Sequence, residues 1–352
     1  MQKLTDTYLV LRFQSLGNVA MMAPILASVA MQQPDAKFVV LARKRLADMF
    51  VGLPNVIFHS ADKENHPDRS KSVLHIFREL SDTHGITQVI DLQNNNRSRR
   101  LDFLFFITGR RITRLHSARM AQRRLCKHGY AESQPLPTEF SRYADTFFRA
   151  GLRSDNAFCS IPVNTEAADA VTARFGEHKG TWLGIAPFAK SRTNMLPYRI
   201  SKEVIARFSK RPDTRLFLFG AGNVECEMLR QWAGVFQNVE SVAGQLSLAE
   251  ELELMRRLDL MLCMDSANQH LASLVALRCL SVWCGTHPYT GFYGWKQRPE
   301  DNIQQPLSCR PCTMHGKNRC SYRNFLCRNF TSAEITERVE SALGGLKGLR
   351  PI

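Results

Sequence analysis

The sequence predicts an α/β protein of two domains, each built on a parallel β-sheet that helices cover on both faces. Short apolar runs alternate with amphipathic segments in the first half of the chain, and the same alternation restarts near residue 181. The stretch between the halves, residues 151–180, is polar without a strong period, which is typical of a connection. Apolar strands separated by helices belong in parallel sheets, so we expect two α/β domains.

The expected strands follow one another with helix candidates between them. They cover residues 8–13, 37–42, 55–58, 88–92 and 111–114, then 181–186, 214–219, 258–264 and 279–283. A tight turn precedes the apolar helix candidate at residues 19–31, and residues 72–83 are amphipathic. Ser247 with Glu250 three residues later predicts the start of another helix, and the last helix is expected from about residue 331.

The composition excludes several classes of protein. The chain has 352 residues, of which 44% are apolar and 22% charged, as in globular proteins large enough for two cores. No apolar run reaches the roughly 20 residues that span a bilayer, and residues 1–6 lack the apolar stretch of a signal peptide. We therefore expect a cytoplasmic protein whose ten cysteines are thiols or metal ligands.

The chain carries a large positive charge. Its 47 lysines and arginines exceed the 32 acids, and the net charge of +15 favours an anionic partner. Residues 97–127 are rich in arginine and lysine and hold a single acid, Asp102. Apolar residues 103–107 interrupt this stretch, which indicates a folded surface with a positive face. Charge alone would also suit nucleic acid, but the sequence contains no recognised nucleic-acid module, and no such partner is expected.

In parallel sheets, ligands bind beyond the carboxyl ends of the strands, so the turns there are the candidate sites. The clearest follows the strand at residues 258–264 and runs from Asp265 to His270. A helix start exposes backbone N–H groups that bind anions, and Ser266 and Asn268 add polar side chains. The alternative is an ordinary helix cap, with His270 satisfied in the core. The residues by themselves leave both interpretations open.

The pattern Asp265, Ser266, His270, Leu271 and Ala272, followed after a strand by Gly285, Thr286 and Pro288, resembles a known signature. It is similar to the donor-site motif of the ADP-heptose:lipopolysaccharide heptosyltransferase family, glycosyltransferase family 9. Residues 12–19, 89–93, 185–187 and 292–294 also resemble family segments, so the likeness covers nearly the whole chain.

This resemblance implies the GT-B architecture, in which two Rossmann-like domains with parallel sheets face a central cleft. An acceptor domain would span residues 1–165 and a nucleotide-sugar domain residues 166–352, with the last helix free to pack back on the first domain. The implied activity is inverting, metal-independent transfer of heptose from ADP-heptose to a lipopolysaccharide-core-type acceptor. Such a lipid-linked acceptor and a basic surface would bring the protein to the inner face of the cytoplasmic membrane as a peripheral protein.

The resemblance also assigns site residues. Donor-binding roles fall on Asn194, Gly220, Glu225, Asp265, Ser266, Ala267, Asn268, His270 and Thr286. Catalytic roles fall on position 18 and on the charges of Lys190 and Arg192, and acceptor-binding roles on Gln93, Arg97, Arg99 and Arg100. For the turn at residues 220–225, a cradle for the nucleoside and a plain turn with a surface glutamate are equally good interpretations.

Two positions depart from the family pattern. Asn18 stands where the family has an aspartate base, and an amide cannot accept the proton. Asn18 would fill a helix N-cap as well as aspartate does. Asp91, His66 or Glu64 could replace the base, or the protein could bind a nucleotide sugar without efficient transfer. Asn194 stands where the family has a lysine for the diphosphate, a charge that Lys190 and Arg192 could supply.

Four late cysteines, Cys309, Cys312, Cys320 and Cys327, match the ligand count of a structural zinc site. Their spacing is not the usual pair of close C-x-x-C hooks. Reduced thiols packed in a loop are the alternative, and the sequence does not decide between the two.

Overall fold

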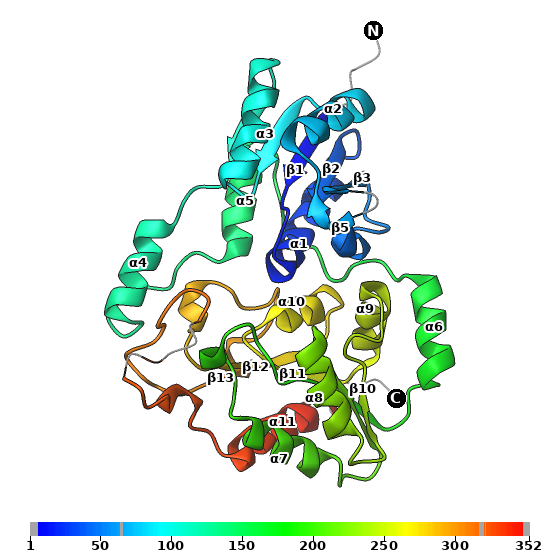
Figure 1. Cartoon of the computed structure of the whole chain (residues 1–352), viewed down its shortest axis with the longest axis vertical. Coiled ribbons are helices and arrows are strands. Elements are labelled where there is room, and N and C mark those ends of the chain that lie inside the picture. Colours follow the sequence, from blue (N-terminus) through cyan, green and yellow to red (C-terminus); the bar gives the residue numbers. More distant parts are fainter. Residues whose placement is uncertain (1–5, 64–65, 317–319, 321, 348–352) are drawn as a thin grey trace. The chain divides into compact units, whose positions relative to one another are not determined.

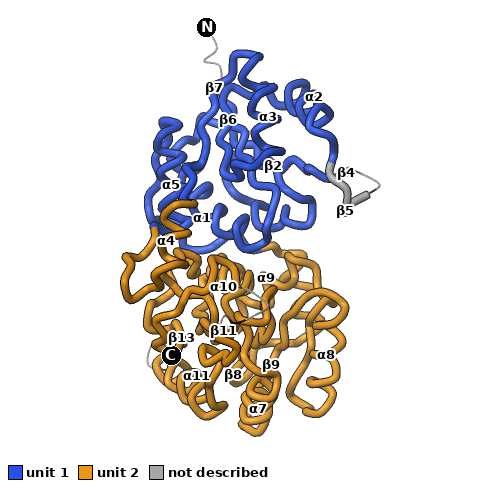
Figure 2. The backbone as a smooth tube through the Cα atoms, turned by 60° about the vertical axis from the view of Figure 1, so that its left-hand side comes forward, with its two compact units in different colours: residues 1–118, 137–163 blue, residues 119–136, 164–352 orange. Residues whose placement is uncertain are grey.

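The computed structural model describes residues 6–63, 66–316, 320 and 322–347, and the chain divides into two compact units. Unit 1 comprises Met1–Ala118 and Pro137–Val163, and unit 2 comprises Arg119–Leu136 and Asn164–Ile352 (Figure 2). The boundary between residues 163 and 164 lies close to the expected one. The segment 119–136, however, comes from the first half of the sequence and belongs to unit 2.

Unit 1 is built on a five-stranded parallel sheet in the order β3-β2-β1-β6-β7. The first three of these strands, β1, β2 and β3, are labelled side by side in Figure 1. Its strands are β1 (Thr7–Leu11), β2 (Lys37–Ala42), β3 (Val56–Ser60), β6 (Gln88–Asp91) and β7 (Arg111–Arg114). A separate antiparallel pair is formed by β4 (Asp62–Lys63) and β5 (His66–Ser70). The five parallel strands coincide with the predicted ones to within a few residues.

Helices complete unit 1. They are α1 (Leu16–Gln32), η1 (Lys44–Met49), α2 (Val73–His84), α3 (Asn96–Ile107) and α5 (Glu139–Arg149). Side chains of α2 and α3 form one core with Leu9, Leu11 and Val39 of the sheet. The long helix α1 is buried from Val19 through Ala30 and packs against α5, which agrees with its almost wholly apolar sequence.

Unit 2 is built on a six-stranded parallel sheet in the order β10-β9-β8-β11-β12-β13. Its strands are β8 (Thr181–Ala186), β9 (Thr214–Leu218), β10 (Val239–Ser241), β11 (Leu260–Met264), β12 (Cys279–Trp283) and β13 (Asn302–Gln304). The four predicted strands are present. The sequence pattern does not reveal β10 and β13, which have three residues each.

The helices of unit 2 are more numerous. They are α4 (Arg119–His128), α6 (Thr165–Phe175), η2 (Arg192–Asn194), α7 (Tyr198–Phe208), α8 (Asn223–Ala233), α9 (Leu248–Arg257), α10 (Ala267–Leu274), η3 (Pro288–Thr290), η4 (Pro299–Asp301), η5 (Leu326–Arg328) and α11 (Ser332–Lys347). The capping box of Ser247 and Glu250 is confirmed at the start of α9. The expected connection, residues 151–180, contains α6.

The last helix packs within its own unit, and its packing on the first domain stays a prediction. Helix α11 belongs to unit 2, where it packs on α7 and β11. Its residues Ile335, Val339 and Ala342 are buried in the same core as the central strands of that unit. The apolar stripe of α11 is therefore already covered within its own unit.

In both sheets the strand order reverses at one place, between β1 and β6 in unit 1 and between β8 and β11 in unit 2. Chains leave the two strands at such a switch point in opposite directions, which leaves a crevice at their carboxyl ends. In unit 2 the turns that follow β8 and β11 carry Asn194 and Asp265. The topology therefore places the predicted donor residues where a ligand site is expected.

Candidate functional site

The turn from Asp265 to His270 begins where β11 ends. All five residues of β11 are buried, so the strand fixes the position of Asp265 firmly. Ser266 occupies the N-cap of α10 with an extended backbone, yet its side chain makes no capping hydrogen bond. The N–H groups of the first turn of α10 thus receive no acceptor from the cap residue. A helix start in this condition is suited to an anion.

Asp265 connects three separate elements through its carboxylate. One oxygen accepts hydrogen bonds from Thr286 Oγ1 at 2.5 Å and from Asn194 Nδ2 at 3.3 Å, and the other accepts from Gln269 Nε2 at 3.1 Å. Burial raises the pKa of Asp265 to about 6, while the donors from Thr286 and Gln269 act in the opposite direction. The structure thus brings the predicted residues Asn194, Asp265 and Thr286 together, and adds Gln269.

Two polar atoms beside this network have no hydrogen-bond partner. They are Ser266 Oγ and His270 Nδ1, both buried in the described chain. His270 is only 5% exposed, and burial lowers its pKa to about 3, so the imidazole is neutral at physiological pH. Buried polar atoms are nearly always paired, so unpaired atoms mark a place for a polar ligand. This result departs from the alternative of an ordinary cap with a satisfied histidine.

A buried arginine that was not among the predicted site residues fixes the chain after β12. Arg310 is 0% exposed and donates hydrogen bonds to the carbonyl oxygens of Trp283 at 2.9 Å and Thr286 at 2.7 Å, and also to that of Cys284. Its charge also lowers the pKa of Asp265. The only sequence sign of this role is an arginine beside a proline between Cys309 and Cys312, a pattern that indicates a metal site first.

Gly316 allows the chain after Arg310 to lie directly on Asn194. Its φ is +82°, and a Cβ there would lie 2.4 Å from Asn194 Oδ1. The carbonyl oxygen of His315 accepts from Asn194 Nδ2 at 3.5 Å, the same group that donates to Asp265. Asn194 is therefore held between Asp265 and residues 315–316. Its amide has a structural role, whatever it contributes to a ligand.

The cationic side chains of the same turn remain accessible. Lys190 and Arg192 are both exposed, and they lie within four residues of Asn194. The guanidinium of Arg192 lies 5.5 Å from the centre of the Phe325 ring, which orients it by a cation–π contact. Positive charge is thus available near the start of α10 from the turn that follows β8.

The turn after β9 is stabilised by a hydrogen bond between two of its own residues. The Glu225 carboxylate accepts a hydrogen bond from the backbone N–H of Ala221 at 3.1 Å, and burial raises the pKa of Glu225. A Cβ at Gly220 would lie 2.7 Å from Leu229 Cδ1, so glycine there lets α8 pack closely. These contacts agree with a structural turn, and a nucleoside-binding role for Glu225 remains a prediction.

In unit 1, Asn18 is not the N-cap of α1. The cap position is Ser15, and Asn18 lies inside the first helical turn with a half-buried side chain. Its carbonyl oxygen accepts from the hydroxyl of Tyr143 at 3.4 Å. The helix starts earlier than expected because Leu16 and Gly17 already adopt helical geometry. The side chain of Asn18 is thus not required for capping.

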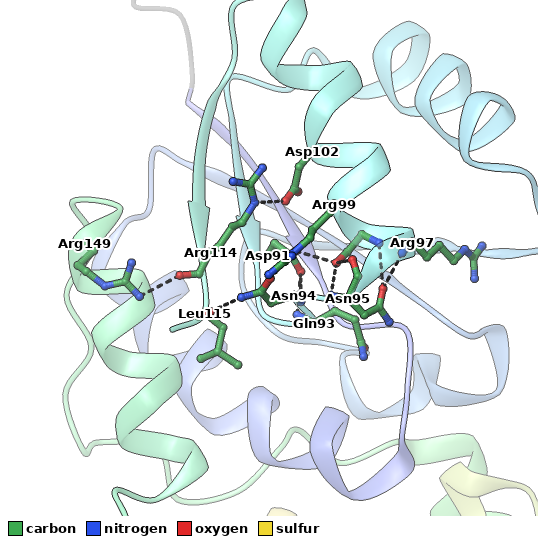
Figure 3. A network of polar contacts seen from close by, with 11 residues as sticks. Asp91, Gln93, Asn94, Asn95, Arg97, Arg99, Asp102, Arg114, Leu115 and Arg149 are labelled. Carbon is green, nitrogen blue, oxygen red and sulfur yellow. Dashed lines mark hydrogen bonds and ion pairs between the residues drawn. The ribbon is translucent and has the colours of Figure 1, made fainter. Parts of the chain in front are cut away.

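Asp91, one of the alternative bases, is engaged in its own turn (Figure 3). It is fully buried, and one oxygen accepts from the backbone N–H groups of Gln93 and Asn94, each at 2.8 Å. The other oxygen accepts from Ser98 Oγ at 2.7 Å. These bonds make Asp91 a structural carboxylate. Glu64 lies outside the described residues, as does the side chain of His66.

Gln93 and the three predicted arginines follow β6. Gln93 Oε1 is buried without a hydrogen-bond partner. Arg97, Arg99 and Arg100 line an open depression of about 880 Å³ together with residues 71–74 at the start of α2. Arg97 donates to the Lys71 carbonyl oxygen at 3.0 Å. Arg99 donates to Asn94 Oδ1 at 2.8 Å (Figure 3), so both arginines are oriented from within unit 1.

Comparison with known proteins decides the family. The model of glycosyltransferase family 9 (heptosyltransferase) matches residues 78–322, which is more than half of the chain. The chain belongs to glycosyltransferase family 9. No curated protein matches it significantly by sequence. The resemblance inferred from the Asp265–His270 motif is thereby confirmed.

Solved structures show that this glycosyltransferase has the GT-B fold. A family 9 glycosyltransferase from Veillonella parvula DSM 2008 matches with a TM-score of 0.71 and 15% identity over 96% of this chain and 97% of that one. The E. coli ADP-heptose lps heptosyltransferase II matches with 0.69 and 14% over 97% and 99%. E. coli heptosyltransferase WaaC with ADP-2-deoxy-2-fluoro heptose matches with 0.60 and 14% over 95% and 99%.

The cysteines of the glycosyltransferase do not form a ligand set in the described structure. Cys309, Cys312, Cys320 and Cys327 form no disulfide bonds, and burial raises the pKa of Cys327 to about 11. No group of three or more histidine, cysteine or acidic side chains among the described residues is arranged to hold a metal ion.

The described part of the chain contains no helix with the length and apolar character of a membrane span.

Proposed function

We propose that this glycosyltransferase binds a nucleotide sugar at the Asp265–His270 turn and transfers the sugar to an anionic glycolipid. The observation that supports this most is the Asp265 network beside the uncapped start of α10, where Ser266 and His270 each leave a polar atom unpaired. Family membership and the names of the E. coli structures favour heptose as the sugar, ADP-heptose as the donor and a lipopolysaccharide core as the acceptor.

In this proposal the donor diphosphate lies against the first N–H groups of α10, near Ala267 and Asn268. The exposed charges of Lys190 and Arg192 add to the helix dipole and stabilise the departing diphosphate. These groups supply the positive charge that departure requires, so transfer does not depend on a metal ion. The acceptor hydroxyl attacks the anomeric carbon opposite the diphosphate, the carbon–oxygen bond to phosphate breaks, and the configuration inverts. The nucleoside diphosphate leaves with the bonding electrons, and the hydroxyl proton passes to solvent because Asn18 cannot accept it.

The acceptor would bind unit 1. Gln93 offers an unpaired buried oxygen at the end of β6, and Arg97, Arg99 and Arg100 line the neighbouring depression. Guanidinium groups bind phosphate and carboxylate through paired hydrogen bonds, which suits the anionic inner core of a lipopolysaccharide. A lipid-linked acceptor would also bring the protein to a membrane surface.

A second candidate function is nucleotide-sugar binding with slow transfer. Asn18 cannot take the proton of the acceptor hydroxyl, and the hydrogen bonds of Asp91 leave it poorly placed to do so. A missing general base typically lowers a rate by about 10²–10⁴-fold. We therefore expect transfer by the native protein to be slow.

The substitution Asn18→Asp tests this point. A carboxylate in the first turn of α1 is kept ionised by the helix dipole and can act as the base. We expect the turnover number for heptose transfer from ADP-heptose to rise by about 100-fold. Gln14→Glu is the matched control, because it adds the same charge at an exposed position of the same turn. An unchanged rate in Asn18→Asp would show that a different group takes the proton.

A further inference from the structure

Helix α3 is apolar on the side that faces away from its unit. Phe103, Phe106 and Ile107 are 60%, 63% and 61% exposed, and their spacing of three and four residues places them on one stripe. The opposite stripe, with Leu101 and Phe105, is buried in the core of unit 1. The outward aromatic residues therefore add nothing to the core. Such a cluster on a surface marks an interaction site.

Cations surround this apolar stripe. Arg99 and Arg100 are exposed one turn earlier on the same side of α3, and Arg110 and Arg111 are exposed just after the helix ends. Residues 96–111, all of them described, contain one acid. This acid, Asp102, is buried on the inner side, where Arg114 Nε donates to it at 2.6 Å. Arg99, Arg100 and Arg110 are therefore the cations beside the apolar stripe, and residues 96–111 expose no carboxylate. Arg111 begins β7 and alternates with Ile112, which packs toward α3, so its side chain lies on the other face of the sheet.

We propose that the outward side of α3 docks on the surface of an anionic lipid bilayer. Phe103, Phe106 and Ile107 enter the boundary between headgroups and acyl chains, and the arginines hold the lipid phosphates. A lipid surface is favoured over a protein partner because exposed arginines lie at both ends of the exposed apolar stripe with no exposed acid among them. A free phosphate would use the arginines but would leave the three apolar side chains without a role.

This inference extends the proposed function, because Arg99, Arg100 and Phe103 also line the depression assigned to the acceptor. An enzyme docked through α3 would meet a lipid-linked acceptor at the bilayer surface. Binding to vesicles requires neither the donor nor the acceptor. A failure of the transferase assignment would therefore leave the vesicle result intact, and the reverse also holds.

The test is cosedimentation of the full chain with vesicles of phosphatidylcholine alone and of phosphatidylcholine mixed equally with phosphatidylglycerol. We expect binding only to the mixed vesicles, with affinity reduced about tenfold in the double variant Phe106→Ser, Ile107→Ser. Arg110→Gln should lower the affinity about fivefold. Neither substitution touches the core, because all three side chains are exposed.

Two control variants match these changes. Phe148→Ser removes an aromatic side chain of equal exposure, 62%, from α5, and Arg45→Gln removes an exposed arginine from η1. Both should bind the mixed vesicles as the native protein does. The proposal is overturned if the native protein does not bind the mixed vesicles, or if Phe148→Ser weakens binding as much as the double variant does. It is equally overturned if the double variant converts a dimer into a monomer, since α3 would then be a protein interface.

Discussion

His270 lies one turn inside α10, where burial determines its charge. Burial lowers the pKa of His270 from 6.5 to about 3, because the imidazolium would lose its hydration without gaining a hydrogen-bond acceptor. Its position could be predicted from the Asp265–His270 motif. Its unpaired Nδ1 could not, because that depends on which side chains of other elements reach it.

The shift of His270 predicts a dependence of stability on pH. The pKa of His270 is lower in the folded protein than in the unfolded chain. Between these two pKa values the unfolded chain binds a proton that the folded protein does not bind. The stabilisation is complete above pH 6.5 and is lost as the pH falls toward 3. We expect the free energy of unfolding of the native protein to fall, relative to His270→Asn, by about 1.4 kcal/mol per pH unit below 6.5.

Urea unfolding at several values between about pH 7 and about pH 4 would measure this difference. The exposed His116 provides the control, since His116→Asn should keep the pH dependence of the native protein. Parallel curves for the native protein and His270→Asn would contradict the account of a buried neutral imidazole.

The turn after β12 is held in place by one side chain, that of Arg310. This side chain satisfies carbonyl oxygens along the chain that leaves β12, and one of them belongs to Thr286, which donates to Asp265. The position of β12 could be predicted because its buried residues form a short, mostly apolar run in the sequence. The sequence could not predict the support of the following turn, which comes from a residue more than twenty positions later.

Arg310→Lys tests this support. A single ammonium group cannot reach the carbonyl oxygens on which the planar guanidinium converges, and unpaired buried carbonyls are costly. We expect a loss of about 2 kcal/mol in the free energy of unfolding, together with weaker ADP binding. Arg298→Lys, at an exposed position, should change neither quantity. Equal stability of the two variants, measured by thermal unfolding, would remove Arg310 from this role.

Other elements show where prediction from sequence stops. Strands β10 and β13 have three residues each, too few for a period to appear. Helix α6 lies in the polar connection and buries only Ala167, Val171 and Phe175. Its apolar stripe is narrow because it packs mainly against α9. Short or weakly buried elements leave little pattern in the sequence, whereas the central strands leave a strong one.

For the whole molecule, the sequence predicted two α/β units with a boundary near residue 165. The assignment of residues 119–136 to unit 2 was not predictable, because it results from tertiary contacts. Tyr130 stacks on His287 with ring centres 4.1 Å apart, and the Leu136 N–H donates to the Tyr289 carbonyl oxygen at 2.9 Å. Nothing in the pattern of residues 119–136 distinguishes them from the elements of unit 1 on either side.

The division into units predicts where a nucleotide changes amide exchange. If the donor site belongs to unit 2, ADP should slow hydrogen exchange in the turns after β8, β11 and β12 and in the first turn of α10. Exchange in the turn of Asn18 and in α3 should change little. Hydrogen-exchange mass spectrometry with and without ADP makes this measurement. Protection concentrated in residues 91–100 would place the nucleotide in unit 1 and contradict the proposal.

The claim that the start of α10 holds the donor diphosphate is tested most directly by calorimetric titration with ADP. Asn268→Asp keeps the shape of the side chain but adds a negative charge in the first turn, which repels phosphate while it suits the helix dipole. Asn96→Asp adds the same charge at the start of α3 in unit 1. We expect the native protein and Asn96→Asp to bind ADP equally, and Asn268→Asp to bind it at least about tenfold more weakly with undiminished stability. Absence of ADP binding by the native protein, or equal binding by Asn268→Asp, would contradict the account.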